Sequence, residues 1–464
     1  PMVLHAHRRL PFAYKSVLLA TGAMLLGVTG CTGGTGGTGG PPAPSVPSWS
    51  DTTVNAVSRP VTASGVTAVT ALRADGRLET AVYELATGER RWARPAAMAG
   101  RLPGMGVQPP AVAGPDRSPV VAALEPRAAK DSGERGKATL VVRDARTGER
   151  RWSRPVDSTF GPVRCGPQLC MSESTDRSDA RFVALEWSSG RVLWQLPGVA
   201  EVESSDGRRV VVFRMTGSPT LEYRELRTGR TLWSFPVEQA VGPGVDLAGG
   251  WTFTATENTL VGYLAPYQKA KGRPLSAFGF FGLRMTDGKP LWTRKRLLRV
   301  YPSASPSVAL LTREVDARGG YGDFARLDPR TGRTIGRVAA DLAPKAAWWL
   351  AFPADLSKLG FLSQGRPGSA VDLRQGTAVA ARGLRAWSFC TVNPAELRIA
   401  GHRGFYPIAP LCAYDLGTGR KVSDPGPPPA WYTGVFDGWR VWRDEQGALH
   451  AVRDAAGTLP GMYG

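Results

Sequence analysis

Carboxylates recur along this 464-residue chain at one fixed place, four residues before a glycine. Seven acids share this position: Glu84, Asp144, Glu186, Glu225, Asp328, Asp372 and Asp415. Acids that recur at a fixed spacing could act as general acids and bases. A carboxylate just before a glycine turn can instead accept hydrogen bonds from the backbone N–H groups of that turn. We interpret the seven acids as turn caps rather than as catalytic groups.

Histidine is scarce, which removes much of the usual catalytic chemistry. After the first fifty residues the chain contains only His402 and His450. The sequence has no HExxH zinc motif, no GxSxG nucleophile elbow and no Walker phosphate loop. We therefore predict no catalytic residue, no metal ligand and no cofactor.

The acids belong to a repeated unit, because the glycines themselves recur along the chain. Near-identical strings surround the first two, TGERRWARP at Thr87–Pro95 and TGERRWSRP at Thr147–Pro155. Nine glycines mark the copies: Gly88, Gly148, Gly190, Gly229, Gly288, Gly332, Gly376, Gly419 and Gly457. Most spacings are close to 42 residues, and two are close to 60. The two long units predict inserted loops, which we place at Ala113–Lys137 and Ala265–Leu275.

Each copy has the pattern of a strand, a tight turn and a second strand. Alternation of apolar and polar residues precedes the glycine, as expected for a half-buried strand. The glycine supplies the positive φ that a hairpin turn requires. A tryptophan follows four residues later in the first five copies: Trp92, Trp152, Trp194, Trp233 and Trp292. We expect these five side chains to pack between neighbouring units rather than to stack on a ligand.

Short strands with a period of about 40–45 residues are typical of a β-propeller with four strands per blade. The pattern A-x-D-x-x-T-G-x-x-x-W also resembles the repeat of the pyrroloquinoline-quinone-like propellers, over roughly residues 55–464. We predict an all-β propeller over residues 51–464 with eight blades, and seven as the alternative. One of the nine glycines is assigned to an inner hairpin or to the ring closure.

The first fifty residues have the pattern of an export signal. Arg8, Arg9 and Lys15 precede an apolar run, Ser16–Gly30, which is too short to span a membrane. Val28–Cys31 resembles the lipobox of bacterial lipoproteins, in which the cysteine is lipid-modified. We predict a signal peptide at 1–30, lipidation of Cys31 and a Gly/Thr/Pro-rich tether at 31–50. The alternative is an ordinary secretory signal with an incidental cysteine.

Four further cysteines remain in a chain that is expected to be exported. An even number in such a protein predicts two disulfides, which we assign as Cys165–Cys170 and Cys390–Cys412. A zinc site is the alternative, but the chain has no CxxC spacing and almost no histidine.

The formal net charge of +19 does not indicate nucleic-acid binding. Basic residues are spread through every repeat, with local clusters at Arg294–Arg296 and at Lys269, Lys271 and Arg273. A nucleic-acid surface would concentrate them beside aromatic residues. Attraction to anionic lipids or wall polymers is a further hypothesis.

The resemblance allows three functional hypotheses. Quinoprotein dehydrogenases would imply a quinone, calcium and ligands in the central channel, but no position here matches those ligands, and the chain has no adjacent cysteine pair. The resemblance also includes the propeller scaffold lipoprotein of the outer-membrane β-barrel assembly machinery. We therefore expect a monomeric, membrane-anchored, extracytoplasmic module that binds a protein or envelope partner. A small-ligand sensor in the funnel is the third hypothesis.

Overall fold

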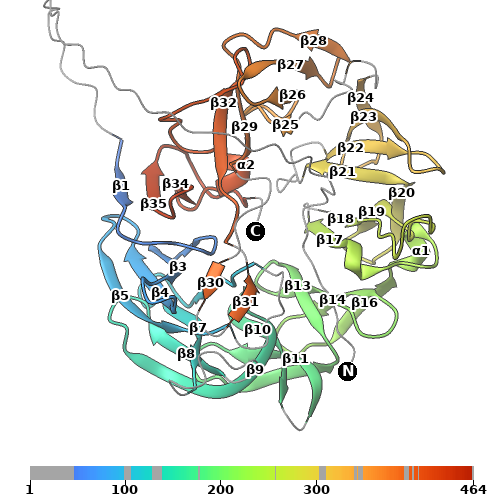
Figure 1. Cartoon of the computed structure of the whole chain (residues 1–464). Coiled ribbons are helices and arrows are strands. Elements are labelled where there is room, and N and C mark those ends of the chain that lie inside the picture. Colours follow the sequence, from blue (N-terminus) through green and yellow to red (C-terminus); the bar gives the residue numbers. More distant parts are fainter. Residues whose placement is uncertain are drawn as a thin grey trace, which may run out of the picture.

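The computed structural model describes residues 46–98, 106–127, 138–175, 178–255, 258–301, 310–338, 342, 349–390, 397–399, 402–405 and 407–461. These residues form antiparallel sheets that stand next to one another around a ring, as Figure 1 shows. We number the sheets as blades 1 to 9 in the order in which the chain forms them. The predicted propeller architecture is confirmed.

Blades 1 to 3 form the first third of the ring. Blade 1 contains β2 (Val61–Ala63), β3 (Val66–Leu72), β4 (Leu78–Glu84) and β5 (Arg90–Ala96). Blades 2 and 3 form one seven-stranded sheet of β6 (Ala111–Ala113), β7 (Val120–Pro126), β8 (Ala138–Asp144), β9 (Arg150–Cys165), β10 (Gln168–Thr175), β11 (Ser178–Glu186) and β12 (Val192–Pro197). The long β9 joins the two, because its first half pairs with β8 and its second half with β10.

Blades 4 to 7 are four-stranded sheets whose strands follow the order of the chain. Blade 4 contains β13 (Ala200–Ser205), β14 (Arg209–Arg214), β15 (Thr220–Glu225) and β16 (Thr231–Pro236). Blade 5 contains β17 (Trp251–Ala255), β18 (Thr259–Leu264), β19 (Gly279–Arg284) and β20 (Pro290–Lys295). Blade 6 contains β21 (Leu297–Tyr301), β22 (Leu310–Val315), β23 (Tyr321–Leu327) and β24 (Thr334–Val338). Blade 7 contains β25 (Trp349–Ala351), β26 (Lys358–Ser363), β27 (Arg366–Asp372) and β28 (Thr377–Val379).

Blades 8 and 9 have three strands each in the described residues. Blade 8 contains β29 (Arg385–Phe389), β32 (Leu411–Asp415) and β33 (Arg420–Lys421), with the hairpin of β30 (Leu397–Ile399) and β31 (His402–Phe405) inserted after β29. Blade 9 contains β34 (Trp439–Arg443), β35 (Leu449–Arg453) and β1 (Ser48–Asp51). In the described residues, short helices lie between strands at α1 (Glu238–Val241), η2 (Leu247–Gly249) and α2 (Ala430–Thr433).

The predicted count of eight blades is wrong, because the described residues form nine. Each of the nine glycine marks belongs to a different blade, so no mark had to be assigned to an inner hairpin. The last mark, Gly457, follows β35 in blade 9. Blade 9 then takes its outer strand from the other end of the chain, since β1 pairs with β35. Blade 9 therefore contains Gly457 although no strand of the described residues follows this glycine in the sequence.

The start of the propeller also differs from the expectation. The predicted tether ended at residue 50, whereas β1 begins at Ser48 and is part of the ring. Of the two predicted insertions, residues 128–137 of the first lie outside the described residues. The second is a loop between β18 and β19. In the same long unit, α1 and η2 lie before β17. The β30–β31 hairpin was not predicted, because the glycine spacing across blade 8 is an ordinary 43 residues.

The hydrophobic core is divided among the contacts between neighbouring blades. The largest cluster packs aromatic side chains of blades 4 and 5, including Phe213, Trp233, Phe253 and Phe281. A second large cluster joins blades 6 to 8 with α2 through Phe324, Phe361, Trp387 and Trp431. Burial of this kind repeats from blade to blade, which holds the ring as one body.

Candidate binding site at the ring closure

The recurring acids are engaged by their own turns. Asp144 accepts hydrogen bonds through Oδ1 from the backbone N–H groups of Arg146 and Thr147, both at 2.9 Å. Asp372 accepts the equivalent bonds from Arg374 (2.7 Å) and Gln375 (3.1 Å). Burial raises the pKa of Asp144, but these bonds and Arg151 outweigh it and hold the pKa below its usual range. The geometry is that of a turn cap.

The repeated tryptophans connect each blade to the next. The Trp92 indole N–H donates to the carbonyl of Ala145 at 2.9 Å, and its ring lies against Gly148. The acceptor is the residue three positions before the glycine of the following blade. The same bond is made by Trp152 to Trp187 (2.7 Å), Trp194 to Leu226 (2.6 Å) and Trp233 to Met285 (2.8 Å). A side chain at the glycine would occupy the space of the ring, so glycine is required there for close approach as well as for its positive φ.

Sequence reasoning missed a sixth member of this series, Trp49. Its N–H donates to the carbonyl of Leu85 at 2.7 Å, and its ring lies against Gly88. Trp49 thus joins blade 9 to blade 1. The repeat pattern does not predict this role, because Trp49 comes before the first repeat glycine in the sequence but lies in the outer strand of the last blade. A tryptophan close to the expected start of the ring, with no repeat glycine before it, is the feature that could have indicated this role.

The series weakens at Trp292 and then ends. Trp292 packs against Gly332, but its indole N–H has no hydrogen-bond partner among the described residues. In the next blade Gly336 takes the place of the tryptophan, and a Cβ there would lie 1.9 Å from the carbonyl oxygen of Leu373. Blades 6 and 7 therefore meet backbone to backbone.

Both predicted disulfides are present. Cys165–Cys170 closes the β9–β10 hairpin, and both cysteines are buried. Cys390–Cys412 joins the end of β29 to β32 in blade 8, across the segment that contains the inserted hairpin.

Calcium and a quinone do not fit the residues that the structure describes. Within these residues, one group of His, Cys, Asp and Glu side chains has spacing suitable for a metal ion: Cys390, Cys412 and Glu445. Two of the three form a disulfide, so their sulfur atoms are not thiolate ligands. The recurring carboxylates are occupied by turns and arginines. We derive no chemistry from either group.

A charged network fastens β1 to blade 1. The Tyr83 hydroxyl donates to Oδ2 of Asp51 at 2.8 Å, and Arg90 donates to the same oxygen at 2.7 Å. Thr53 donates to Oδ1 from both its backbone N–H and its hydroxyl. Burial raises the pKa of Asp51, but the bonds from Thr53, Arg90 and Tyr83 outweigh it, so the pKa lies well below its usual range. Burial and the bond to Asp51 raise the pKa of Tyr83.

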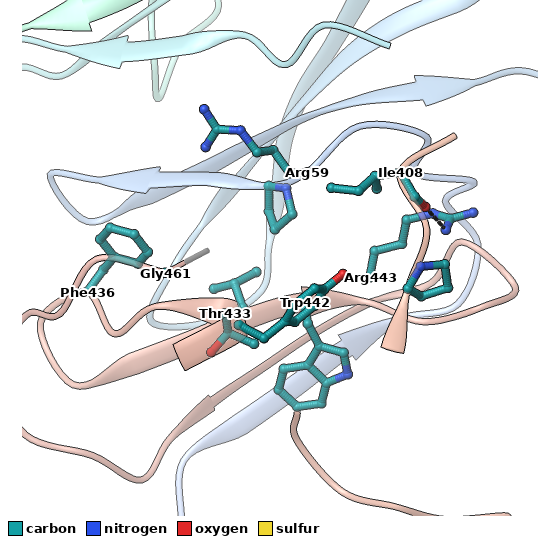
Figure 2. A pocket seen from close by; sticks show the side chains of 11 residues that line it. Arg59, Ile408, Thr433, Phe436, Trp442, Arg443 and Gly461 are labelled. Carbon is teal, nitrogen blue, oxygen red and sulfur yellow. Dashed lines mark hydrogen bonds between the residues drawn. The ribbon is translucent and has the colours of Figure 1, made fainter. Parts of the chain in front are cut away.

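A pocket lies beside this closure, between the first and last parts of the ring (Figure 2). Its space is about 470 Å³, including the opening to solvent. Eleven residues line it: Arg59, Pro60, Ile408, Pro410, Tyr432, Thr433, Phe436, Val441, Trp442, Arg443 and Gly461. The walls are thus mainly apolar and aromatic, with two arginines.

Arg443 ties three segments together at the edge of the pocket. Its Nε donates to the carbonyl of Ala56, and its Nη1 donates to the carbonyl of Ile408 at 2.9 Å, a bond drawn in Figure 2. The backbone of Ile408 in turn donates to Val57 at 3.0 Å. Burial lowers the pKa of the Arg443 guanidinium. Among the described residues no ion pair joins Arg443 to a carboxylate.

The predicted lipidation site, Cys31, and the signal segment lie outside the described residues. In the part of the chain that the structure describes, no helix is long and apolar enough to cross a membrane.

Comparison with known proteins gives one family. A family model described as outer membrane protein assembly factor BamB matches residues 48–196 and 178–347. No curated protein matches the chain. Among solved structures, BamB from Moraxella catarrhalis is 14% identical, with 86% of this chain and 99% of that chain covered and a TM-score of 0.42.

Two other solved structures match to a similar extent. The computationally designed Ika8 protein is 14% identical, with 86% and 96% of the two chains covered and a TM-score of 0.38. The quinohemoprotein alcohol dehydrogenase from Comamonas testosteroni is 14% identical, with 89% and 77% covered and a TM-score of 0.35.

Proposed function

Because the chain belongs to the family of the outer membrane protein assembly factor BamB, we propose that it is a non-catalytic scaffold that binds other proteins of the cell envelope. The family match over residues 48–347 is the observation that carries this proposal. The ring supports it, since blades locked to one another present loops in fixed positions, and rigidly held loops suit protein recognition.

The proposal includes export and a lipid anchor. Val28–Cys31 supplies a lipidation signal, and the Gly/Thr/Pro-rich segment after Cys31 supplies a tether. The protein then acts as a monomer on the outer face of the cell membrane. No described carboxylate or cysteine group suits a calcium–quinone centre, so the dehydrogenase hypothesis has no residue in its favour.

Site-specific photo-crosslinking in the native host tests the scaffold. A benzophenone side chain placed at Lys271, in the β18–β19 loop, and at Arg330, in the turn of blade 6, samples two separate exposed surfaces. We expect at least one position to crosslink reproducibly to an envelope protein that mass spectrometry identifies. Absence of any crosslink, with turnover of a substrate by the purified protein, would contradict the scaffold.

The anchor is tested by Cys31→Ser. We expect loss of metabolic palmitate labelling and release of the protein from the membrane fraction, with an unchanged melting temperature of the propeller. A Cys31→Ser variant that remains lipid-labelled and membrane-bound would overturn the anchor but leave the scaffold standing.

A further inference from the structure

The pocket at the ring closure is bounded by the part of β34 that contains Val441 and Arg443, and no strand of the described residues pairs with its inner edge there. Blade 9 ends at β34 on its inner side, because the sheet order is β1, β35, β34. Asp444 donates its backbone N–H to Ala448 at 3.0 Å, in the register that pairs Trp442 with His450. Since bonds to β35 alternate along an antiparallel strand, Val441 and Arg443 direct their N–H and C=O groups away from β35.

The chain before β34 begins to cover this edge and then turns away. Phe436 and Trp439 exchange backbone hydrogen bonds of 2.8 and 2.9 Å, which starts a hairpin on the inner side of β34. A continued hairpin would place residues 432–434 opposite Val441 and Arg443. Those residues instead end α2, which follows three consecutive prolines, Pro427 to Pro429. Because the residues of α2 are helical, no fourth strand of this blade is formed in the described residues.

The pocket occupies the place of that missing strand. In Figure 2, Thr433 and Trp442 lie side by side below the pocket, Phe436 lies to the left and Arg443 to the right. Pro60 and Pro410 contribute further apolar wall. A free strand edge beside apolar walls matches an extended polypeptide, whose backbone continues the ladder while its side chains fill the pockets.

The charge at the edge selects the class of peptide. Arg443 uses two of its five N–H groups on carbonyl oxygens and forms no ion pair with a described carboxylate. Arg59 lies across the pocket. A half-buried guanidinium that forms no ion pair with a described carboxylate favours a carboxylate on the ligand.

We propose that β34 binds an extended, apolar peptide that carries a carboxylate, as the missing inner strand of blade 9. The inference rests on the proposed scaffold function and names the chemistry of its partner. The added strand bonds to the backbone of Val441 and Arg443, and its carboxylate lies toward Arg443.

Fluorescence anisotropy with a defined probe tests this proposal on the full chain. The probe is fluorescein-labelled Val-Thr-Val-Thr-Phe with a free terminal carboxylate, compared with its terminal amide and with a form N-methylated at alternate residues. We expect saturable binding of the acid, about tenfold weaker binding of the amide, and at least tenfold weaker binding of the N-methylated form, which lacks the backbone donors along one strand edge.

Substitutions in the protein test the same edge of β34. Val441→Pro removes the N–H that points into the pocket and leaves the bonds to β35 intact. Ser48→Pro is the matched control, because Ser48 lies in β1 of the same sheet and its N–H faces away from β35 on the outer edge. We expect Val441→Pro to weaken binding about tenfold and Ser48→Pro to leave it unchanged, with melting curves that confirm both folds.

Equal binding of the acid and its N-methylated form would overturn the proposal, even if Val441→Pro failed to fold. No binding of any probe, while the photo-crosslinks of the scaffold persist, would overturn this site and leave the proposed function standing. Loss of both would remove the proposed function itself.

Discussion

The indole of Trp194 shows how one residue type can join two blades. Its ring is buried, with 8% of its surface exposed, and packs against Gly229 of the next blade. Its N–H donates to the carbonyl of Leu226 at 2.6 Å, so burial leaves no polar group unpaired. The repeated tryptophan therefore packs between two blades and forms a hydrogen bond with its indole N–H. Both roles are structural.

Replacement of Trp194 by alanine should destabilise the ring. We expect Trp194→Ala to lower the free energy of unfolding by about 3–5 kcal/mol, because it opens a cavity between blades 3 and 4. Leu232→Ala serves as the control, since Leu232 is on an outer strand but is exposed, and should change stability by less than about 0.5 kcal/mol. Urea denaturation followed by circular dichroism measures both, and equal effects would contradict the docking role.

Asp51 gives the ring closure a dependence on pH. Its pKa in the folded protein is below that of the unfolded chain, which is about 4. The stabilisation from its ionised form is therefore complete above about pH 4 and is lost as the pH falls through the lower folded value. In Asp51→Asn the unfolding free energy should decline less steeply with acid below pH 4 than in the unmodified protein. Parallel slopes in urea titrations across this range would contradict the assignment.

The hairpin turn is the element that receives the tryptophan of the preceding blade. Gly229 has a φ of 73°, and a Cβ there would lie 2.6 Å from the ring of Trp194. Gly217, in the β14–β15 turn of the same blade, has a φ of 82° and no atom within 4 Å of a Cβ. The two glycines share the backbone requirement, but only Gly229 has a neighbour that a methyl group would displace.

This difference separates backbone strain from packing. Gly217→Ala should lower the unfolding free energy by about 1 kcal/mol, the cost of a left-handed conformation for alanine. Gly229→Ala carries the same cost and should lose about 1–3 kcal/mol more through overpacking against Trp194. The melting temperatures of the two variants, measured side by side, test the comparison. A Gly217→Ala protein that is the less stable of the two would refute it.

The elements show what the sequence could predict. Local patterns were sufficient for the turn, the strands on either side of it and the Cys165–Cys170 pairing, because these involve residues close in the chain. Trp49 and the pocket depend on contacts between the two ends of the chain, which no local period reveals. The blade count was wrong for the same reason, since the closing strand comes from before the first repeat. The unpaired edge of β34 depends on where α2 replaces a strand, and that is visible only in three dimensions.

At the scale of the whole molecule, the nine blades form a closed ring in which most of the repeated residues have structural roles. The acids cap turns, the tryptophans and glycines lock neighbouring blades, and the disulfides join adjacent strands. The charged network of Asp51 and the carbonyl contacts of Arg443 fasten the two ends. In the proposed scaffold function, recognition is assigned to loops and open edges.

Calorimetric titration of the full-length protein with pyrroloquinoline quinone and calcium tests this account most directly. A quinoprotein dehydrogenase stripped of its cofactor, titrated in parallel, shows that the ligands are active, and a melting curve shows that the protein is folded. We predict no saturable heat, because the repeated residues are committed to the structure of the ring. Saturable binding at micromolar concentration or below would contradict the scaffold and return the chain to the quinone-dependent enzymes.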